Sequence, residues 1–236
     1  SSIYLLHLLS SVNTSVIASA TLSFSILAST FSCIASATAL RKLISSNKDI
    51  TSYLPEPSLD VLKTNIKYGK TVPSISCFER EIIYTLRKMS LADIANLQDV
   101  TEGLENLIKS AANSCNNLED LINSIKSKRF TRSRIQRILL YSLLNITKKD
   151  KVDSYKANPY IRVLGVSYRG KILLSQISEN KKYPVITSVK KFVDLNNNKT
   201  LKKMLDKDIL ASNIYTLGYE YDSKANLDYT KKLIIN

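Results

Sequence analysis

A cluster of charged side chains lies in the stretch KSKRFTRSRIQR at residues 126–137, here called the basic block. The basic block holds six cations and no acid: Lys126, Lys128, Arg129, Arg132, Arg134 and Arg137. Such a cluster repels itself unless an anion neutralises it, and a nucleic-acid backbone is the usual partner. Phe130 is available to stack on a base. The basic block predicts an RNA-binding site, with a solvated basic face as the alternative.

The stretch IASATALR at residues 34–41 places small and hydroxyl residues directly before an expected helix. A helix N-terminus offers free N–H donors and the positive end of the helix dipole, and both favour a bound phosphate. Ser36 and Thr38 can donate their hydroxyls to that phosphate, and Arg41 can form a fork on the same oxygens. An ordinary capped helix with a solvated arginine explains the same pattern.

Acids gather in the stretch DVTEGLEN at residues 99–106. Paired carboxylates can do acid and base chemistry. Glu102 and Glu105, however, fall in the expected first turn of a helix capped by Thr101, where the dipole favours acids. We therefore interpret this cluster as structural.

Several kinds of chemistry lack the residues they need. His7 is the single histidine, and the three cysteines, Cys33, Cys77 and Cys115, are far apart in the sequence. Nucleophile–histidine pairs and metal centres built on histidine or cysteine therefore have no basis, and no metal site or catalytic residue is assigned. The five glycines form no phosphate-binding loop. Unpaired thiols indicate a reducing compartment, so we expect a cytoplasmic protein.

The charge balance points to polyanionic partners. The chain has 236 residues and a formal net charge of +14, and residues 1–40 contain no charged side chain.

The uncharged, serine-rich segment at residues 1–40 has three interpretations. Residues 12–40 could span a membrane, although serine and threonine dilute the apolar run. A signal peptide would need a basic start, which is missing. We favour the tail of a truncated α/β domain, with no stable membrane association.

The remaining pattern is mainly helical. Apolar residues recur every three or four positions on four expected helices. The four apolar stripes are Phe78, Ile82, Ile83, Leu86 and Met89; Leu104, Leu107, Ile108 and Ala111; Leu118, Leu121, Ile122 and Ile125; Ile135, Ile138 and Leu139. We expect Thr101, Asn117 and Thr131 to cap the second, third and fourth of these helices. Beyond the charged residues 148–156, we expect strands at 160–166 and 184–189 and helices at 171–178 and 194–217.

These elements give a fold that is mostly α with a smaller α/β portion. We expect the tail of an α/β domain at residues 1–54. A helical region should follow at 55–150, and a small α/β region at 151–236.

Five stretches together resemble one family. IASATALRK (34–42), DVTEGLEN (99–106), IKSKRFTRSRIQRILLYSLL (125–144), PYIRVLG (159–165) and ASNIY (211–215) stand in the order found in tRNA(Met) cytidine acetate ligases, which are HIGH-type nucleotidyltransferases. The resemblance implies activation of acetate with ATP to acetyl-adenylate, with Mg²⁺ expected. It also implies acetyl transfer to N4 of the wobble cytidine of elongator tRNA(Met). In the fold that the resemblance implies, residues 1–54 are the tail of a nucleotidyltransferase-like domain and residues 55–150 are the tRNA-binding region.

The resemblance assigns roles to two groups of residues. Ser36, Thr38 and Arg41 match the second nucleotide-binding motif of such enzymes, and the six cations of the basic block match the tRNA-binding region. The front of the sequence departs from the family, because His7 stands in YLLHLLSS without the expected two-histidine motif. We therefore expect this chain alone to form little or no acetyl-adenylate. A tRNA-binding module without catalysis and a membrane-anchored basic protein remain the alternatives.

Overall fold

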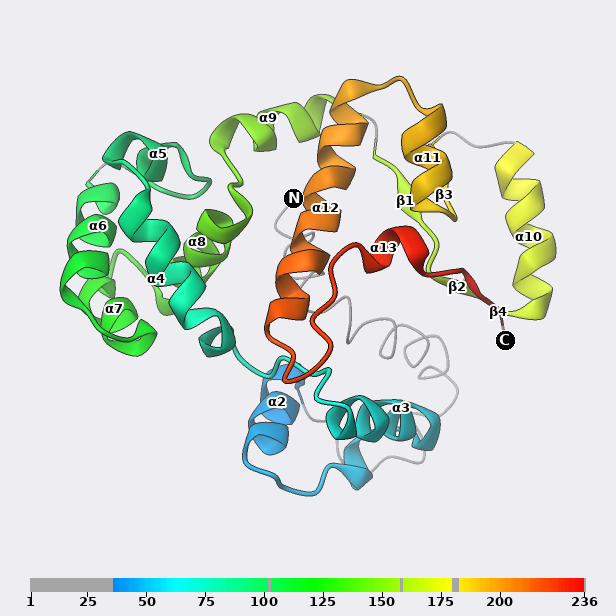
Figure 1. Cartoon of the computed structure of the whole chain (residues 1–236), viewed down its shortest axis with the longest axis horizontal. Coiled ribbons are helices and arrows are strands. Elements are labelled where there is room, and N and C mark those ends of the chain that lie inside the picture. The colour runs from blue at the N-terminus through cyan, green and yellow to red at the C-terminus, as the bar shows by residue number, and fades with distance from the viewer. Residues whose placement is uncertain (1–35, 102, 158, 180–182, 236) are drawn as a thin grey trace. The chain divides into compact units, whose positions relative to one another are not determined.

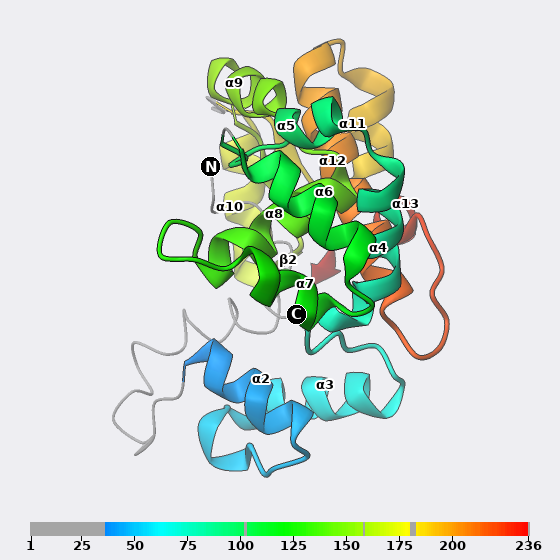
Figure 2. The ribbon, with the colours of Figure 1, turned by 90° about the vertical axis from the view of Figure 1, so that its left-hand side faces the viewer.

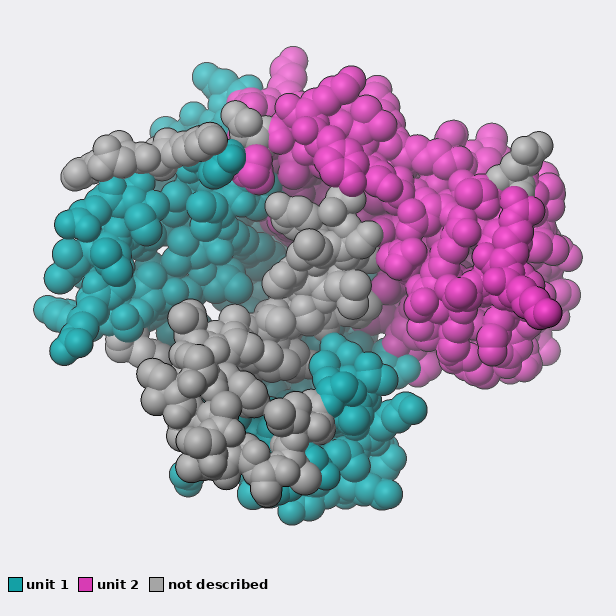
Figure 3. Space-filling model, turned by 180° about the vertical axis from the view of Figure 1, so that it is seen from behind, with its two compact units in different colours: residues 1–74, 160–197, 211–236 teal, residues 75–159, 198–210 magenta. Residues whose placement is uncertain are grey.

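The computed structural model describes residues 36–101, 103–157, 159–179 and 183–235 (Figure 1). The described chain divides into two compact units, shown in two colours in Figure 3. Unit 1 comprises residues 1–74, 160–197 and 211–236, and unit 2 comprises residues 75–159 and 198–210. The mostly helical class predicted from the sequence is confirmed. The ranges 1–54, 55–150 and 151–236 stay a prediction, and His7 and Cys33 lie outside the described residues.

Unit 2 is built from helices (Figure 2). In chain order they are the 3-10 helix η2 (Ile75–Phe78), α4 (Glu79–Lys88), α5 (Leu91–Asn96), α6 (Leu104–Ser114), α7 (Leu118–Ile125), α8 (Arg132–Leu144), α9 (Lys148–Lys156) and residues 199–210 of α12 (Lys199–Leu217). The helix α9 was not expected from its charged residues. Thr147 and Asp150 form a capping box at its start, and that local signal explains the helix.

The core of unit 2 follows the predicted apolar stripes. Its largest fully buried side chains come from η2, from α4 to α8 and from Leu97, which follows α5: Phe78, Ile82, Leu86, Ile94, Leu97, Leu104, Ile108, Leu121, Ile122, Ile125, Ile135 and Ile138. Leu107 was wrongly placed in the core and is 45% exposed. The buried face of α6 is centred on Leu104 and Ile108, which leaves Leu107 at its edge.

Of the three helix N-caps predicted from the sequence, Asn117 alone makes a side-chain capping bond. The Asn117 side chain accepts a hydrogen bond from the Asp120 N–H at 2.8 Å, which confirms it as the cap of α7. Thr131 stands at the N-cap position of α8 but makes no side-chain capping bond. Thr101 is not the cap of α6, because Gly103 occupies that position with a φ of 84°. The Thr101 hydroxyl instead accepts a hydrogen bond from Arg134.

Two long cations join α4 to α6 at their C-terminal ends. The Lys109 ammonium on α6 donates to the carbonyls of Leu86, Arg87 and Met89 at 2.6–3.1 Å. In return, the Arg87 Nε donates to the Ala112 carbonyl at 2.7 Å. Cations at the C-terminal ends of helices satisfy carbonyls that have no helical partner and match the negative end of the dipole. These four hydrogen bonds fix the pairing of α4 with α6.

Unit 1 has short elements: α2 (Ala37–Ser45), η1 (Thr51–Tyr53), α3 (Glu56–Lys67), α10 (Tyr168–Glu179), α11 (Val189–Leu195), the end of α12 and α13 (Leu227–Thr230). Its strands form two parallel pairs. In the first, β1 (Ile161–Arg162) pairs with β3 (Val185–Ile186), and in the second, β2 (Gly165–Val166) pairs with β4 (Ile234–Ile235).

Two sequence predictions for unit 1 and one for the start of α12 need correction. The strand expected at 160–166 is two short strands, β1 and β2, because each pairs with a different partner. The strand expected at 184–189 ends after β3, where the Ser188 side chain caps α11. The helix expected at 194–217 begins at Lys199, because the Asn198 side chain accepts hydrogen bonds from the Thr200 and Leu201 N–H groups.

Candidate nucleic-acid interface

The turn between α7 and α8 carries the first half of the basic block. The Ser127 N–H donates to the Phe130 carbonyl at 3.1 Å, and the Phe130 N–H donates to the Ser127 hydroxyl at the same distance. These two bonds close the turn over four residues. Lys126, Lys128 and Arg129 are exposed to solvent on it. None of the three makes an ion pair with any residue that the structure describes. We call these three residues the exposed cations.

The second half of the basic block lies on α8 and is held from the loop before α6. The Arg134 guanidinium donates to the Asp99 carbonyl at 2.8 and 3.3 Å and to the Thr101 hydroxyl at 3.2 Å. The Arg137 Nε donates to the Asp99 carboxylate at 2.8 Å. The second oxygen of that carboxylate accepts from the Gln98 amide at 2.7 Å. Asp99 therefore neutralises Arg137 and positions Arg134.

Arg132 makes a more open pair. Its two terminal nitrogens each lie 2.6 Å from an oxygen of Glu119, and both side chains are about half exposed to solvent. The hydrogen bond from Arg132 holds the pKa of Glu119 below its ordinary value. An exposed pair of this kind adds little to stability, because water solvates both groups. Arg132 can therefore exchange its carboxylate partner for another anion at small cost.

Phe130 does not serve the stacking role expected from the sequence. Its side chain is only 6% exposed. The Arg129 and Arg134 guanidinium carbons lie 5.4 and 5.5 Å from its ring centre, within the range of a cation–π contact. A ring buried beneath two guanidinium groups cannot stack on a base. Phe130 instead positions the two arginines, a role that its neighbours in sequence do not reveal.

The predicted phosphate motif is found at the start of α2. The Ser36 hydroxyl accepts a hydrogen bond from the Ala39 N–H at 3.2 Å, which makes Ser36 the cap of this helix. Thr38 is exposed in the first turn, and Arg41 is half-buried one turn further on. The structure thus places Thr38 and Arg41 along the first turns of α2. The Ser36 oxygen, however, already bonds one of the N–H groups that the sequence offered to a phosphate.

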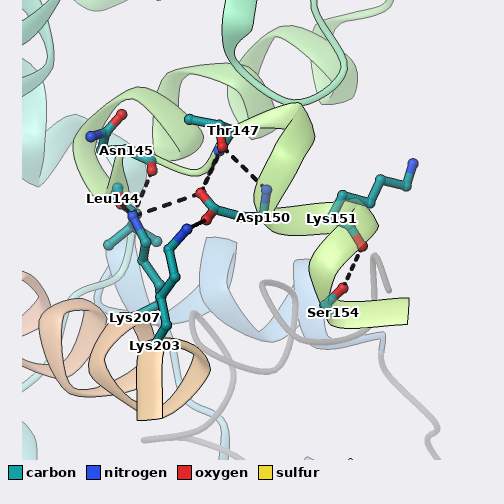
Figure 4. Close-up of polar contacts among 8 residues, drawn as sticks. All are labelled: Leu144, Asn145, Thr147, Asp150, Lys151, Ser154, Lys203 and Lys207. Atoms are coloured by element: carbon teal, nitrogen blue, oxygen red, sulfur yellow. Dashed lines mark hydrogen bonds and ion pairs between the residues drawn. The ribbon is translucent and has the colours of Figure 1, made fainter. Parts of the chain in front are cut away.

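A cluster of two lysines and one acid in unit 2 was missed from the sequence (Figure 4). Lys203 and Lys207 on α12 lie 2.6 and 3.9 Å from the Asp150 carboxylate. The Lys207 ammonium also donates to the Leu144 and Asn145 carbonyls at the end of α8, at 3.1 and 2.6 Å. The cluster ties α12 to α8 and α9. The spacing of two lysines four residues apart was its available signal.

The cluster shifts the acidity of its members. Burial by itself would raise the pKa of Asp150, but the bonds from Lys203 and Thr147 outweigh it, so the pKa lies below the ordinary value. Burial lowers the pKa of Lys207, and the nearby Asp150 charge opposes that effect. The charges of Asp150 and Lys207 therefore depend on each other, and the cluster acts as a structural unit.

The described residues form neither a metal-binding cluster nor a membrane-spanning helix. No group of three or more histidine, cysteine, aspartate or glutamate side chains in the described part of the chain could hold a metal ion. None of the helices described by the structure is both long enough and apolar enough to cross a membrane. The membrane span considered at residues 12–40 lies mostly outside the described residues.

Known proteins resemble this chain over most of its length. The tRNA(Met) cytidine acetate ligase of Caldanaerobacter subterraneus subsp. tengcongensis is 37% identical over 202 residues, which are 85% of this chain and 49% of that relative. The ligase of the same name from Acetivibrio thermocellus is 34% identical over 213 residues, 86% of this chain and 51% of the relative. The chain thus spans about half the length of the curated relatives it matches.

A solved structure shares the fold. The crystal structure of Thermotoga maritima TmcAL bound with alpha-thio ATP superposes with a TM-score of 0.79 and 24% identity, covering 86% of this chain and 52% of that one. The family model described as HIGH Nucleotidyl Transferase matches residues 10–230, nearly the whole sequence. The chain therefore belongs to the HIGH nucleotidyl transferase family, among relatives that are tRNA(Met) cytidine acetate ligases.

Proposed function

We propose that this chain acts in the ATP-dependent acetylation of the wobble cytidine of elongator tRNA(Met), and that its basic block binds the tRNA backbone. The name of the curated relatives supports the reaction class. As its unpaired cysteines predict, we place this activity in the cytoplasm. The part of the proposal that the geometry supports best is RNA binding, and one observation carries it. That observation is the turn between α7 and α8, which presents three cations on a closed backbone.

The six cations of the basic block contribute unequally in this proposal. Lys126, Lys128 and Arg129 meet RNA phosphates directly, because no carboxylate of the described residues pairs with them. Arg132 joins them by leaving Glu119 for a phosphate, since its existing pair is exposed and weak. Arg134 and Arg137 support the interface from within, through Asp99 and Phe130. The charge of Arg134, which bonds a carbonyl and a hydroxyl, still attracts RNA at a distance, whereas Asp99 neutralises the charge of Arg137.

The proposed ATP site comprises Ser36, Thr38 and Arg41 on α2. In this proposal Thr38 and Arg41 bind phosphate oxygens, and Ser36 orients the first turn of the helix by capping it. The family resemblance also implies Mg²⁺ with the ATP. The described residues hold no group that fits a metal ion, so no side chain is assigned to it.

The proposal is tested by measuring tRNA affinity across a salt titration. Replacing Lys126, Lys128 and Arg129 together with Ala should weaken binding by about tenfold to a hundredfold at low salt. It should also reduce the log–log salt slope by about two, at roughly 0.7 to 0.9 per lost phosphate contact. A matched control replaces Lys190, Lys191 and Lys199 with Ala. These lysines are also exposed, and the control loses the same number of positive charges. Equal losses in both variants would show that only net charge matters.

A non-catalytic RNA-binding module is the second candidate, favoured by the engagement of Ser36 in helix capping. Acetate-dependent exchange between ATP and pyrophosphate separates the two candidates. Exchange that disappears in Arg41→Ala would support the ligase and the assigned ATP site. Intact tRNA binding without exchange would support the binding module.

A further inference from the structure

A junction in unit 1 exposes two tyrosines on a tightly built backbone. Tyr68 and Gly69 follow the end of α3, and the chain that leaves this helix meets the turn after α12 (Figure 1). The Glu220 N–H donates to the Gly69 carbonyl at 2.9 Å. Tyr68 is 58% exposed and Tyr221 is 67% exposed. We call residues 68–70 and 220–224 the tyrosine junction.

The glycine at the centre of the tyrosine junction is needed for two reasons. Gly69 has a φ of +61°, and the N–H groups of Gly69 and Lys70 bond the carbonyls of Ile66 and Asn65, as in a Schellman motif. A Cβ added at Gly69 would also lie 2.8 Å from the Glu220 Cβ and 2.9 Å from the Tyr221 Cδ2. The Tyr221 ring therefore packs directly against the helix end that carries Tyr68.

Polar bonds hold the turn in place. Asp222 has a φ of 56° and accepts from both Lys70 and Lys224, at 3.4 and 3.0 Å. The Asn226 N–H donates to the Asn213 side chain on α12 at 2.6 Å. The two rings are therefore presented on a preorganised backbone, which lowers the entropy cost of binding a ligand.

Both tyrosines expose their rings on a fixed backbone instead of burying them, and neighbouring exposed rings of this kind can form a binding surface. Aromatic side chains recognise unpaired nucleic-acid bases, since every base offers a flat face for stacking. The junction adds no net charge, because Lys70 and Lys224 both bond Asp222 and Glu220 balances the remaining cation. Stacking is therefore the contact that the junction offers.

We propose that the tyrosine junction binds unpaired nucleotides of the RNA, with Tyr68 and Tyr221 stacking on bases. The inference rests on the proposed RNA-binding function and adds a second contact to it, in the other unit. The two contacts differ in kind. The basic block binds backbone charge, whereas the junction requires bases that are free to stack.

The test compares two labelled probes by fluorescence anisotropy: a single-stranded cytidine octamer and a blunt RNA duplex. Replacing Tyr68 and Tyr221 together with Leu should weaken octamer binding by about tenfold or more, because stacking on one base already contributes that much. Duplex binding should change by less than twofold. The Tyr68→Phe, Tyr221→Phe double variant keeps both rings and should keep octamer affinity.

Matched controls replace Tyr84 and Tyr168 with Leu, because these tyrosines are 65% and 76% exposed and lie outside the junction. Octamer binding at the wild-type level in the Tyr68, Tyr221 double variant would overturn the inference, as would an equal loss in the controls. The failures of the two proposals can be told apart. Replacing the exposed cations could weaken tRNA binding while the tyrosine variant binds the octamer normally. That result would support RNA binding by the basic block and contradict nucleotide binding at the tyrosine junction. A wild-type chain that binds neither probe nor tRNA contradicts both.

Discussion

The two units achieve their structure by different means. Among the residues that the structure describes, all of the largest fully buried side chains lie in unit 2, where helices α4 to α8 share one core. In unit 1, α2 buries none of its side chains, and Tyr168, Ile172 and Leu195 are between 62% and 81% exposed. Polar contacts are prominent instead, among them the Arg162–Asp228 ion pair at 2.6 Å and the bonds of Asn213. In the described residues, buried apolar side chains therefore dominate the packing of unit 2, whereas individual ion pairs and hydrogen bonds are more prominent in unit 1.

This difference bears on function because the two candidate RNA contacts lie in different units. The turn that carries the exposed cations begins at Lys126, directly after the fully buried Ile125. The tyrosine junction depends on Gly69, Asp222 and Asn213, which act through backbone conformation and polar bonds. Because local stability varies with buried apolar contacts, we expect unit 1 to open before unit 2.

The largest expected effect comes from the core of unit 2. Leu121 is fully buried on α7, so Leu121→Ala removes apolar contacts and leaves a cavity. We expect it to lower the free energy of unfolding by about 2 to 5 kcal/mol. Urea denaturation followed by circular dichroism measures the change. A loss below about 1 kcal/mol would mean that this core does not stabilise the unit as described.

The next effect concerns the acid that supports the basic block. Asp99→Ala removes the carboxylate partner of Arg137. It also places alanine at a backbone φ of 67°, a conformation that alanine adopts less readily than aspartate. We expect a loss of about 1 to 3 kcal/mol in unfolding free energy. Asp99→Asn keeps the preference for this backbone conformation and should lose less. Equal stability of both variants and wild type would contradict the support role of Asp99.

Local patterns in the sequence predicted local features of the fold well. Asn117 was identified as a cap and Ile135 as core because their signals lie within one or two turns of the same helix. Tertiary contacts were not predictable in this way. Thr101 was assigned as a cap, but its hydroxyl bonds Arg134, which is far away in the sequence. Phe130 was expected to be free for a base, but the fold buries it.

The candidate site shows the same limit. The sequence located all six cations of the basic block, but it treated them as equivalent. Only the structure separates the exposed cations from Arg134 and Arg137, because their partner Asp99 comes from a different loop. The strands of unit 1 were overestimated for a related reason. An apolar run predicts an extended chain, whereas its partner sets how many residues pair.

A smaller effect should appear in the pH dependence of unit 2. The native pKa of Asp150 lies below its ordinary value of 3.8, mainly because bonds from Lys203 and Thr147 outweigh its burial. The unfolded chain therefore binds the proton more readily, so this contribution is complete above about pH 5 and is lost as the pH falls through the native pKa. Asp150→Asn should cost about 1 to 2 kcal/mol at pH 7.

Thermal unfolding of wild type and Asp150→Asn between pH 7 and pH 3 measures this prediction. The difference in Tm should shrink as the pH falls, because protonation removes from the wild type the stabilisation by the Asp150 charge, which the variant lacks at every pH. A difference that stays constant across the range would assign the effect to capping geometry and not to charge.

The smallest expected effect gives the sharpest test of the comparison between the units. Ile172 and Leu173 on α10 are 62% and 59% exposed, so replacing both with Ala removes little buried area. Alanine also favours the helix slightly. The double variant should therefore change the free energy of unfolding by less than about 0.5 kcal/mol, although it alters two large apolar residues and Leu121→Ala alters one. Urea midpoints at equal slope measure both variants side by side. A loss of about 2 kcal/mol in the α10 variant would mean that its apolar side chains are covered in solution, and burial would then no longer separate unit 1 from unit 2.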